Sequence, residues 1–411
     1  MKHRLILMGI VVILGLGMAG LLIGVLIHQA QAMVAVDTWQ QVGADGLGDP
    51  ANKQIPSMAV FGDYLYAGTW NNDGISVTAQ IMRTSTGDDW EMVDERPVNG
   101  AADMIAFDGA IYAGSWDGMI WSSMNGITWT EIITDGFEGS GNGIARFAIY
   151  SDTLYASTWG DGTEIWRTTD GTHWFPFVQD GLGDLNNSAA IASEIFDGSL
   201  YYGIVNGITG AQLWRTNGIT TTAIITDGFG ITENQAISSL ALFQDMLYAG
   251  TYNLQGVQVW RSMNGVDWEP INFEFGNPLT NQENAMEVFD GQLYLAVANY
   301  TTGMEIWRTS NGTDWEQVGF AGFGDANNHN PYWDNGMTIF KDRLYVGTSN
   351  WPTGGEVWRM TAEIYKTYLP LGLNNYPYLE TGKIVFVSNR DGNDEIYSMN
   401  YDGSEVNRLT N

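Results

Sequence analysis

The sequence predicts an all-β fold of repeated four-stranded antiparallel sheets, and three observations lead to this prediction. A strand with a Leu-Tyr-Ala-Gly pattern occurs seven times, with its tyrosines 43 to 51 residues apart. Further strand patterns accompany each copy, and 51 glycines against only 10 prolines indicate many tight turns rather than disorder. Short strands repeated at this period are typical of β-propeller blades, each of which buries its faces against its neighbours. The expected architecture is therefore a seven-bladed propeller.

Each repeat contains the same strand patterns in the same order. The first strand ends in Phe-Asp-Gly or a variant, as at Phe107, which predicts a tight hairpin into the tyrosine-containing second strand. The third strand carries a Trp-Arg step, as at Trp166 and Arg167. The fourth strand is expected to centre on a further tryptophan, at Trp90, Trp129, Trp174, Trp268 or Trp315.

The seventh repeat lacks a fourth strand of its own. After Trp358 and Arg359 the chain continues as TAEIYKTYLPLGL, which does not match the fourth-strand pattern. The missing strand is found at the other end, where residues 38–42 (TWQQV) match residues 314–318 (DWEQV). We expect this N-terminal strand to close the ring, which removes the open sheet edges that invite aggregation.

An uncharged apolar run of 23 residues, residues 5–27, follows the basic residues Lys2 and Arg4. A helix of this length crosses a bilayer, and its basic end is expected to remain in the cytoplasm. The following Ala30-Gln31-Ala32 is a small-x-small pattern that signal peptidase could cut. The body is thus expected outside the cytoplasm, either anchored in the cell membrane or secreted after cleavage behind Ala32.

Turns between the third and fourth strands carry a recurrent motif, as in RTTDGTHW (residues 167–174) and RTSNGTDW (residues 308–315). They resemble the Asp-box turns of sialidases and of many non-enzymatic propellers, as a variant that lacks one residue before the glycine. The resemblance covers residues 38–361 and is specific for fold, not for activity. It implies that the acid or amide hydrogen-bonds its own turn, and that His173 is an exposed turn residue.

The C-terminal residues 383–411 resemble a single TolB-like propeller repeat, with an SNRDG turn, an EIY strand and a DGS turn. One such unit cannot bury its own faces, so we expect a truncated gene or a fragment of a longer protein. The chain is thus divided into a signal anchor or signal peptide (1–32, with a transmembrane helix at 5–27), a seven-bladed propeller (33–366), a linker (367–382) and the TolB-like repeat (383–411).

Composition excludes several classes of function. The chain has 17 basic and 47 acidic residues, a formal charge of −30, so it is not a nucleic-acid-binding protein. The absence of cysteine excludes disulfides, thiolate metal sites and cysteine nucleophiles. The expected protein is a monomeric propeller that meets the membrane only through its N-terminal helix.

A set of aromatic side chains and a set of amide or acid side chains are expected to meet at the end of the propeller where the loops after the second and fourth strands emerge. Aromatic rings stack on sugars and amides pair with hydroxyl groups, so both sets suit a glycan or protein ligand. The alternative is that the aromatic rings only fill the mouth of the central channel. The candidate residues are Trp70, Asn71, Trp116, Asp117, Trp159, Asn206, Tyr252, Asn253, Asn299, Tyr300, Asn350 and Trp351.

Acidic glycine-rich loops precede several first strands, for example DGLGDPAN from Asp45 and DGLGDLNN from Asp180. Their oxygen atoms could bind calcium, although Asp-Gly-x-Gly is also ordinary turn chemistry. The candidate calcium ligands are Asp45, Asp49, Asp180, Asp184 and Asp325. No other cofactor is expected.

The resemblance to sialidases does not extend to a catalytic site. The arginine cluster of those enzymes is missing, and Gln54-Ile55-Pro56 stands where that family often has Arg-Ile-Pro. His329 is the only plausible general base at the candidate end, and no catalytic residue is assigned. The leading hypothesis is a ligand-binding module without catalysis. The alternatives are a glycoside hydrolase or lyase that uses carboxylates at this end, and a purely structural cell-surface scaffold.

Overall fold

The computed structural model describes residues 28–137, 142–273, 275, 281–329, 336–371, 383–388, 395–400 and 407–408. The chain divides into two compact units, Asp37–Ala362 and a second unit of Met1–Val36 with Glu363–Asn411. The described ranges contain no α-helix, only the 3-10 turns η1 (Asp45–Gly48), η3 (Asp180–Gly183) and η4 (Ala321–Gly324). Within them, therefore, no helix could span a membrane. The apolar run at 5–27 lies outside the described residues.

The unit Asp37–Ala362 is built from four-stranded antiparallel sheets in which sequence neighbours pair. The first three sheets follow one another along the chain and have the same strand order from the inside of the ring outward. They comprise β2 (Asn52–Phe61), β3 (Tyr64–Asn72), β4 (Val77–Thr84) and β5 (Glu91–Arg96); β6 (Ala101–Phe107), β7 (Ala110–Ser115), β8 (Ile120–Ser123) and β9 (Thr130–Ile133); and β10 (Ile144–Tyr150), β11 (Thr153–Thr158), β12 (Ile165–Thr168) and β13 (Phe175–Val178).

The next two sets of four strands form one eight-stranded sheet, because Val205 of β15 pairs with Ala236 of β18. A further four-stranded sheet follows them. These sets comprise β14 (Ala189–Phe196), β15 (Ser199–Val205), β16 (Gln212–Thr216) and β17 (Thr221–Ile225); β18 (Asn234–Phe243), β19 (Met246–Asn253), β20 (Val259–Ser262) and β21 (Glu269–Pro270); and β22 (Asn281–Phe289), β23 (Gln292–Asn299), β24 (Glu305–Thr309) and β25 (Glu316–Gln317).

The last sheet joins the two ends of the ring-forming chain. Its inner strands are β26 (Met337–Phe340), β27 (Arg343–Gly347) and β28 (Val357–Leu371), and β1 (His28–Gln41) pairs with β28 at the outer position. Just beyond β1, the backbone N–H of Val42 donates to the carbonyl of Val357 at 2.9 Å. The strand that completes this sheet thus comes from the N-terminal side of the chain.

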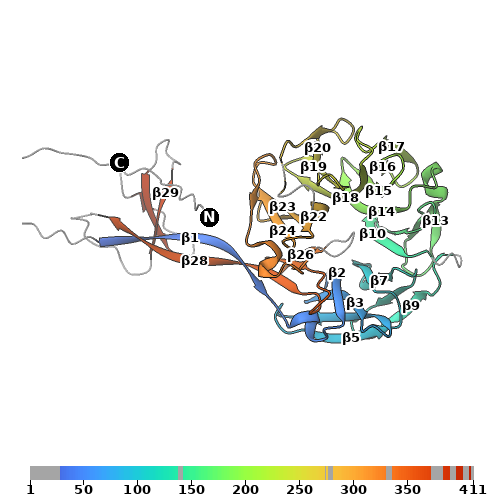
Figure 1. Ribbon diagram of the computed structural model, residues 1–411, viewed down its shortest axis with the longest axis horizontal. Coiled ribbons are helices and arrows are strands. Elements are labelled where there is room, and N and C mark those ends of the chain that lie inside the picture. Colours follow the sequence, from blue (N-terminus) through green and yellow to red (C-terminus); the bar gives the residue numbers. More distant parts are fainter. Residues whose placement is uncertain are drawn as a thin grey trace, which may run out of the picture. The chain divides into compact units, whose positions relative to one another are not determined.

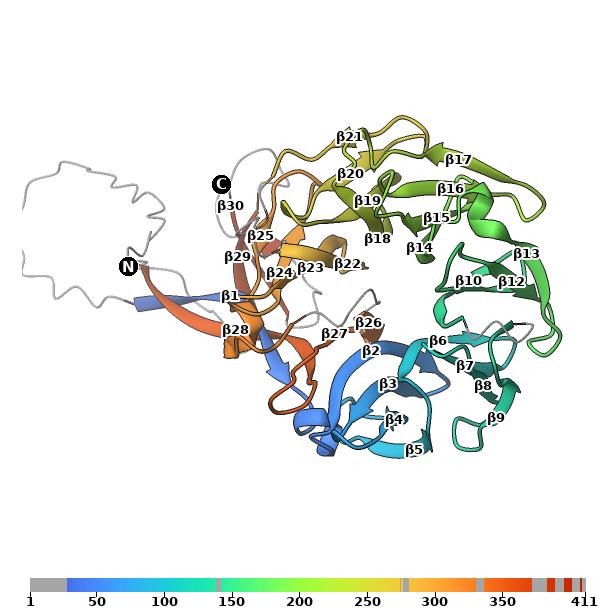
Figure 2. The same cartoon turned by 45° about the vertical axis from the view of Figure 1, so that its right-hand side comes forward.

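The sheets are arranged around a central axis, with one inner strand from each (Figures 1 and 2). The inner strands contact one another in cyclic order, and the last of them, β26, contacts the first, β2. Apolar clusters fill the space between adjacent sheets; one of them combines Tyr66 of β3 with Ile111 and Trp121 of the next sheet. The core is therefore a series of layers between sheets, because no single sheet has enough apolar surface to form a core alone.

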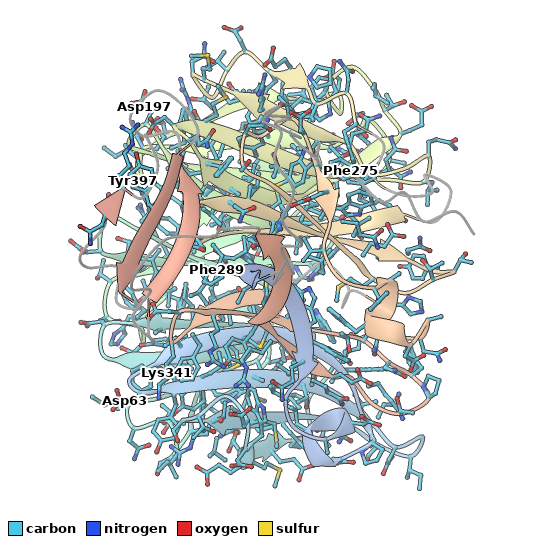
Figure 3. All side chains as sticks on the ribbon, turned by 90° about the vertical axis from the view of Figure 1, so that its left-hand side faces the viewer. Asp63, Asp197, Phe275, Phe289, Lys341 and Tyr397 are labelled. Carbon is cyan, nitrogen blue, oxygen red and sulfur yellow. The ribbon has the colours of Figure 1, made fainter. Side chains whose placement is uncertain are left out.

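Tight hairpins join the first and second strand of each sheet at one end of the ring. At Asp108 and Gly109 both residues have positive φ, 45° and 76°, as a two-residue type I′ turn requires. Figure 3 shows Asp63, Asp197 and Lys341, all from these turns, along one side of the ring. Every hairpin carries an exposed aspartate, namely Asp63, Asp108, Asp152, Asp197, Asp245, Asp290 and Asp342. We call this side the hairpin end.

The turns that resemble Asp boxes join the third and fourth strands of a sheet and contact the neighbouring sheet. In one of them Asp170 Oδ1 accepts hydrogen bonds from the backbone N–H of Thr172 and His173 at 2.9 and 2.8 Å. A Cβ added to Gly171 would lie 1.7 Å from the Tyr112 hydroxyl of the preceding sheet, so only glycine allows this contact. Gly126 against Tyr66 and Gly312 against Tyr248 repeat the arrangement, at 1.7 and 1.9 Å. The side chain of His173 is 77% exposed, as predicted.

One detail of the strand prediction is wrong. The fourth strands that follow these turns do not centre on the tryptophans but begin one residue after them, as β9 does after Trp129. The turn is the reason, because its amide or carboxylate binds the backbone N–H groups just before the tryptophan and delays the start of the ladder; Asn125 Oδ1 accepts from Thr128 N at 2.8 Å. The Trp129 ring instead packs between sheets, 6.4 Å from Tyr66.

In the second unit the described residues from 383 onward form a three-stranded antiparallel sheet of β29 (Lys383–Ser388), β30 (Glu395–Asn400) and β31 (Asn407–Arg408). Tyr397 is buried at 3% exposure. This sheet falls within the region that resembles a TolB-like repeat.

Candidate functional site

The end of the ring opposite the hairpins is formed by the loops after the second and fourth strands of the sheets. Backbone hydrogen bonds join the two kinds of loop: Gly46 N donates to Gly355 O at 2.8 Å, and Gly228 N donates to Ala211 O at 2.9 Å. The candidate aromatic residues lie here, and we call it the aromatic end. The two loop sets meet because antiparallel strands return the chain to the same end after every second strand.

Three of the tryptophans form a continuous group at this end. The rings of Trp70 and Trp351 are 5.1 Å apart in an edge-to-face arrangement. A Cβ on Gly100 would meet both Trp70 and Trp116 at 2.8 Å, so this glycine lies against both indoles. Trp70 Nε1 donates to Asn99 Oδ1 at 2.8 Å, which fixes the indole. Trp351 remains 49% exposed.

The other predicted aromatic residues lie in two further groups. Trp159 and Tyr252 are partly buried against the same cluster, which contains Ala189 and Ile191 of β14. The ring of Tyr300 is 43% exposed and packs 5.2 Å from the imidazole of His329. The aromatic end therefore presents partly exposed rings whose inner faces contribute to packing.

The predicted amides are buried instead of facing a ligand. Asn71, Asn206, Asn253, Asn299 and Asn350 are each at most 6% exposed. Their side-chain N–H groups donate within the protein, for example from Asn350 Nδ2 to Asp325 Oδ2 at 3.0 Å and to Asn328 Oδ1 at 2.9 Å. Asp117 is exposed and supports its own loop, since Asp117 Oδ2 accepts from Asn99 N at 3.1 Å.

A second asparagine set, missed in the sequence analysis, organises these bonds. Asn52 is fully buried, and its Nδ2 donates to Gly46 O and Gln80 Oε1, both at 2.9 Å. Its Oδ1 accepts from Thr69 Oγ1 and Asn71 Nδ2, also at 2.9 Å. All four hydrogen-bonding positions of the amide are therefore used. We call this residue and its equivalents the staple asparagines: Asn52, Asn187, Asn234 and Asn328.

The equivalent residues repeat this geometry. Asn187 Nδ2 donates to Gly181 O at 2.8 Å and to Gln212 Oε1 at 2.9 Å, and Asn328 Nδ2 donates to Gly322 O at 3.1 Å. Each staple asparagine ties an acidic loop to the second and third strands of the following sheet. The sequence did contain the signal, because each acidic loop ends in an asparagine at the same position.

Four of the five candidate calcium ligands accept hydrogen bonds from nitrogen donors. Asp49 Oδ2 accepts from Asn71 Nδ2 at 2.8 Å, and Asp184 Oδ2 accepts from Asn206 Nδ2 at 3.0 Å. Hydrogen bonds from the backbone and side chain of neighbouring asparagines lower the pKa of Asp184 and Asp325. Asp45 is exposed, with Oδ1 accepting from Gln41 at 2.8 Å, and Asp180 is exposed as well. In the described part of the chain, no three His, Asp or Glu side chains meet as a metal site.

The apolar residue in each acidic loop has a packing role. Phe229 stacks on Trp260 at 4.6 Å with an angle of 7° between the rings, and Phe323 stacks on Trp358 at 4.5 Å. In η4 the backbone of Gly322 and Phe323 adopts φ of 56° and 55°, a left-handed turn that directs the phenyl ring inward. The acidic loops therefore connect adjacent sheets and pack against the third-strand tryptophans of the following sheet.

His329 lies at the aromatic end, half-buried beside Tyr300. Burial lowers the pKa of His329, so the imidazole is neutral at pH 7. Its Nδ1 is buried and has no hydrogen-bond partner in the described structure. We therefore assign no catalytic role to His329.

A group of charged residues in the central channel was not predicted. Arg146 of β10, Glu194 of β14 and Glu287 of β22 line a cavity of about 180 Å³. Asp103 of β6 lies next to this group, with its Oδ2 3.9 Å from Arg146 Nε. In the sequence these residues are far apart within apolar strands, so only the ring brings them together.

Comparisons with known proteins identify the fold. No protein-family model matches the sequence, and no curated protein matches it either. Solved structures are similar to this chain, among them the following three. YCF48 from Cyanidioschyzon merolae has a TM-score of 0.54 at 12% identity, covering 79% of this chain and 98% of its own. The complex of YCF48 with D1 peptide has a TM-score of 0.54 at 13% identity, covering 81% and 100%.

The third is the WD40 β-propeller domain of Doa1, with a TM-score of 0.52 at 14% identity, covering 80% of this chain and 98% of that domain. At these identities the similarity defines the fold and not the function. Together with the four-stranded sheets, it shows that this chain contains a β-propeller.

Proposed function

We propose that this protein is a β-propeller that binds a polypeptide or glycan ligand at its aromatic end and performs no chemistry. The observation that carries the proposal is the continuous group of Trp70, Trp116 and Trp351, which combines edge-to-face packing with exposed ring surface. Partly exposed aromatic rings that are held in place lose little conformational entropy on binding. The group is therefore suited to contact a ligand.

We further infer that the propeller has seven blades and is closed by β1. The cyclic contacts of the inner strands and the pairing of β1 with β28 support this count. The apolar run at 5–27 supports an extracytoplasmic location, with the protein anchored in the membrane or secreted after cleavage behind Ala32. The turns remain Asp-box-like and residues 383–411 TolB-like in this proposal.

The buried amides narrow the kind of ligand. Asn71, Asn206, Asn253, Asn299 and Asn350 are buried and use their N–H groups inside the protein, so the aromatic faces remain as the candidate contact surface. Such a surface stacks on a sugar ring or on the apolar side chains of a peptide. The complex of YCF48 with D1 peptide is a similar fold with a bound peptide, which is consistent with a polypeptide ligand.

The test is a binding screen with the full-length chain against arrays of glycans and of peptides. The variant Trp70→Ala/Trp116→Ala/Trp351→Ala removes the aromatic group, and we expect it to lose the ligands that the unaltered protein binds. Phe175→Ala is the matched control, because Phe175 is 63% exposed on the outer strand β13. Ligands that bind equally well to the triple variant, or an empty screen with both arrays, would contradict the proposal.

A further inference from the structure

The hairpin end has a central cavity lined by charged residues. The cavity of about 180 Å³ is bounded by Arg146, Glu194 and Glu287, and its volume is enough for a side chain that replaces a few waters. The side chains of Arg146 and Asp103 are 12% and 8% exposed. With three carboxylates and one guanidinium, the group carries an excess of negative charge when it is ionised.

The charges in this cavity are incompletely matched. Arg146 Nε is buried without a hydrogen-bond partner, and its separation of 3.9 Å from Asp103 Oδ2 is too long for a hydrogen bond. Asp103 Oδ2 instead accepts from Phe147 N at 2.7 Å. Burial raises the pKa of Glu287 to about 7, and repulsion from Glu194 adds to the effect while Arg146 opposes it. Among the described residues that line the cavity, Arg146 is the one cation for these carboxylates.

Aliphatic side chains surround the mouth of the channel. They occupy the same position of successive inner strands, one residue before the aromatic residue that ends each strand. Their exposed fractions are 37% for Val60, 36% for Ile149, 42% for Ile195, 42% for Leu242 and 37% for Ile339. Leu242 also lines the cavity. Apolar residues that gather at one place on a protein surface are typical of interaction sites.

An outer ring of charge surrounds the aliphatic residues. Each hairpin turn carries an exposed aspartate, and Asp63 and Asp197 mark this side in Figure 3. Lys341 and Arg343 are the cations next to these aspartates, and Lys341 Nζ already donates to Ser85 O at 2.6 Å. From the centre outward the surface is thus anionic, aliphatic and anionic again.

We propose that the hairpin end is a second binding surface, which docks a basic polypeptide segment carrying lysine or arginine beside aliphatic residues. One cationic side chain enters the cavity between Glu194 and Glu287, and the neighbouring aliphatic residues contact Ile195 and Leu242. The aspartates of the hairpins attract the remaining cations. This surface is separate from the aromatic end, so the proposal does not depend on the function proposed above.

The experiment measures binding of a fluorescent peptide of alternating lysine and leucine to the full-length chain, by anisotropy at physiological ionic strength. Two further peptides, with glutamate for lysine and with serine for leucine, separate the charge and the apolar contributions. We expect the lysine-leucine peptide to bind at least about tenfold more tightly than either, because binding needs both contributions.

Two double variants locate the surface. Glu194→Gln/Glu287→Gln removes the two glutamate charges of the channel, and Ile195→Ser/Leu242→Ser removes aliphatic surface without changing charge. Each is expected to weaken binding at least about tenfold. The matched control, Glu233→Gln/Asp73→Asn, removes two exposed charges from loops of the opposite end and is expected to change affinity less than about twofold.

Diffuse attraction to an acidic protein is the competing explanation. If the control variant weakens binding as much as the channel variant, or if the serine-containing peptide binds as tightly as the leucine-containing one, the proposal is wrong. Circular dichroism melts of each variant establish that it is folded. Glu287→Gln should be at least as stable as the unaltered protein, so a loss of binding in the channel variant reports on the surface itself.

Discussion

The two ends of the propeller use their polar side chains in different ways, although the same repeats build both. At the aromatic end the amide and acid side chains form hydrogen bonds within the protein, as Asn52 does with four partners. At the hairpin end Glu194 and Glu287 line an open cavity, and each hairpin aspartate is exposed. The loops of the aromatic end are long and need internal bonds, whereas a two-residue hairpin is complete without them.

This difference shows that recurrence of a polar residue in a repeat protein indicates architecture as often as it indicates function. The asparagines of the aromatic end recur in several repeats and are buried. Glu194 and Glu287 stand two residues before the aromatic residue that ends their inner strands, a position at which three other repeats have alanine. A carboxylate at a position where other repeats have alanine, as in Glu194 and Glu287, is therefore a candidate for binding.

The largest expected effect is loss of the closing strand. Removing residues 1–42 eliminates β1 together with Val42, whose side chain is buried at 2% exposure. It also removes the packing of the Trp39 ring on the Phe323 ring, whose centroids are 5.3 Å apart. We expect the free energy of unfolding to fall by about 5 kcal/mol or more, because a sheet edge and a core layer are exposed together. Urea denaturation is the measurement. Removal of residues 1–36 is the control, and equal stability of the two truncated proteins would contradict closure by β1.

Replacement of a staple asparagine should have the next largest effect on stability. Asn187→Ala leaves Gly181 O, Gln212 Oε1 and Asn206 Nδ2 without this partner in a buried region, and should cost about 3 kcal/mol. The neighbouring Asn186, exposed and bonded to Asp184, provides the control; Asn186→Ala should cost less than about 1 kcal/mol. Similar losses for both variants would show that the aromatic end does not depend on its staples.

The channel carboxylate predicts a smaller, pH-dependent effect. The folded pKa of Glu287, about 7, exceeds the value of an unfolded chain. The contribution of Glu287 to folding stability is fully present at low pH, where the carboxyl group is protonated in both the folded and the unfolded state. This contribution is lost as the pH rises through about 7. Glu287→Gln should therefore stabilise the protein by about 2 kcal/mol at pH 8 and by almost nothing near pH 4.

Thermal melts at the two pH values measure this difference between Glu287→Gln and the unaltered protein. The exposed Glu233 gives the control, since Glu233→Gln should leave the melting temperature unchanged at both pH values. A stabilisation that is independent of pH would show that burial of the charged carboxylate is not its cause.

Calcium should have the smallest effect. Asp49, Asp184 and Asp325 already accept hydrogen bonds from amide nitrogens, which a cation would have to displace. We expect the melting temperatures in calcium and in EDTA to agree within about 1 °C. A higher melting temperature in calcium that the Asp184→Asn variant does not show would instead support the acidic loops as calcium sites. It would place a bound ion at the aromatic end beside the staple asparagines.

Much of the fold could be predicted because its signals are local. The Phe-Asp-Gly hairpins, the Leu-Tyr-Ala-Gly strands and the turn around His173 each depend on a few adjacent residues, and the structure has them. The match of residues 38–42 to residues 314–318 also predicted the pairing of β1 with β28. The fourth strands were expected to centre on the tryptophans but begin one residue after them, because the turn's side chain competes with the ladder for backbone N–H groups.

The candidate site was harder to predict because its chemistry depends on distant partners. Asn71 and Asn350 lie next to aromatic residues in the sequence, as a sugar-binding site would require. Their hydrogen-bond acceptors, Asn52 and Asn328, belong to other strands and leave them buried. No local pattern distinguishes a buried amide from an exposed one when both follow the same strand.

The sequence by itself determined the all-β class, the repeat and the acidic character of this protein, since each is a property of residue type and spacing. Only the tertiary structure decided which polar groups remain available. Arg146, Glu194 and Glu287 meet because the inner strands contact one another in cyclic order. The amides are buried because loops from different strands meet at the staple asparagines and use the amide N–H groups. Burial is a property of the packed ring, and no single repeat contains it.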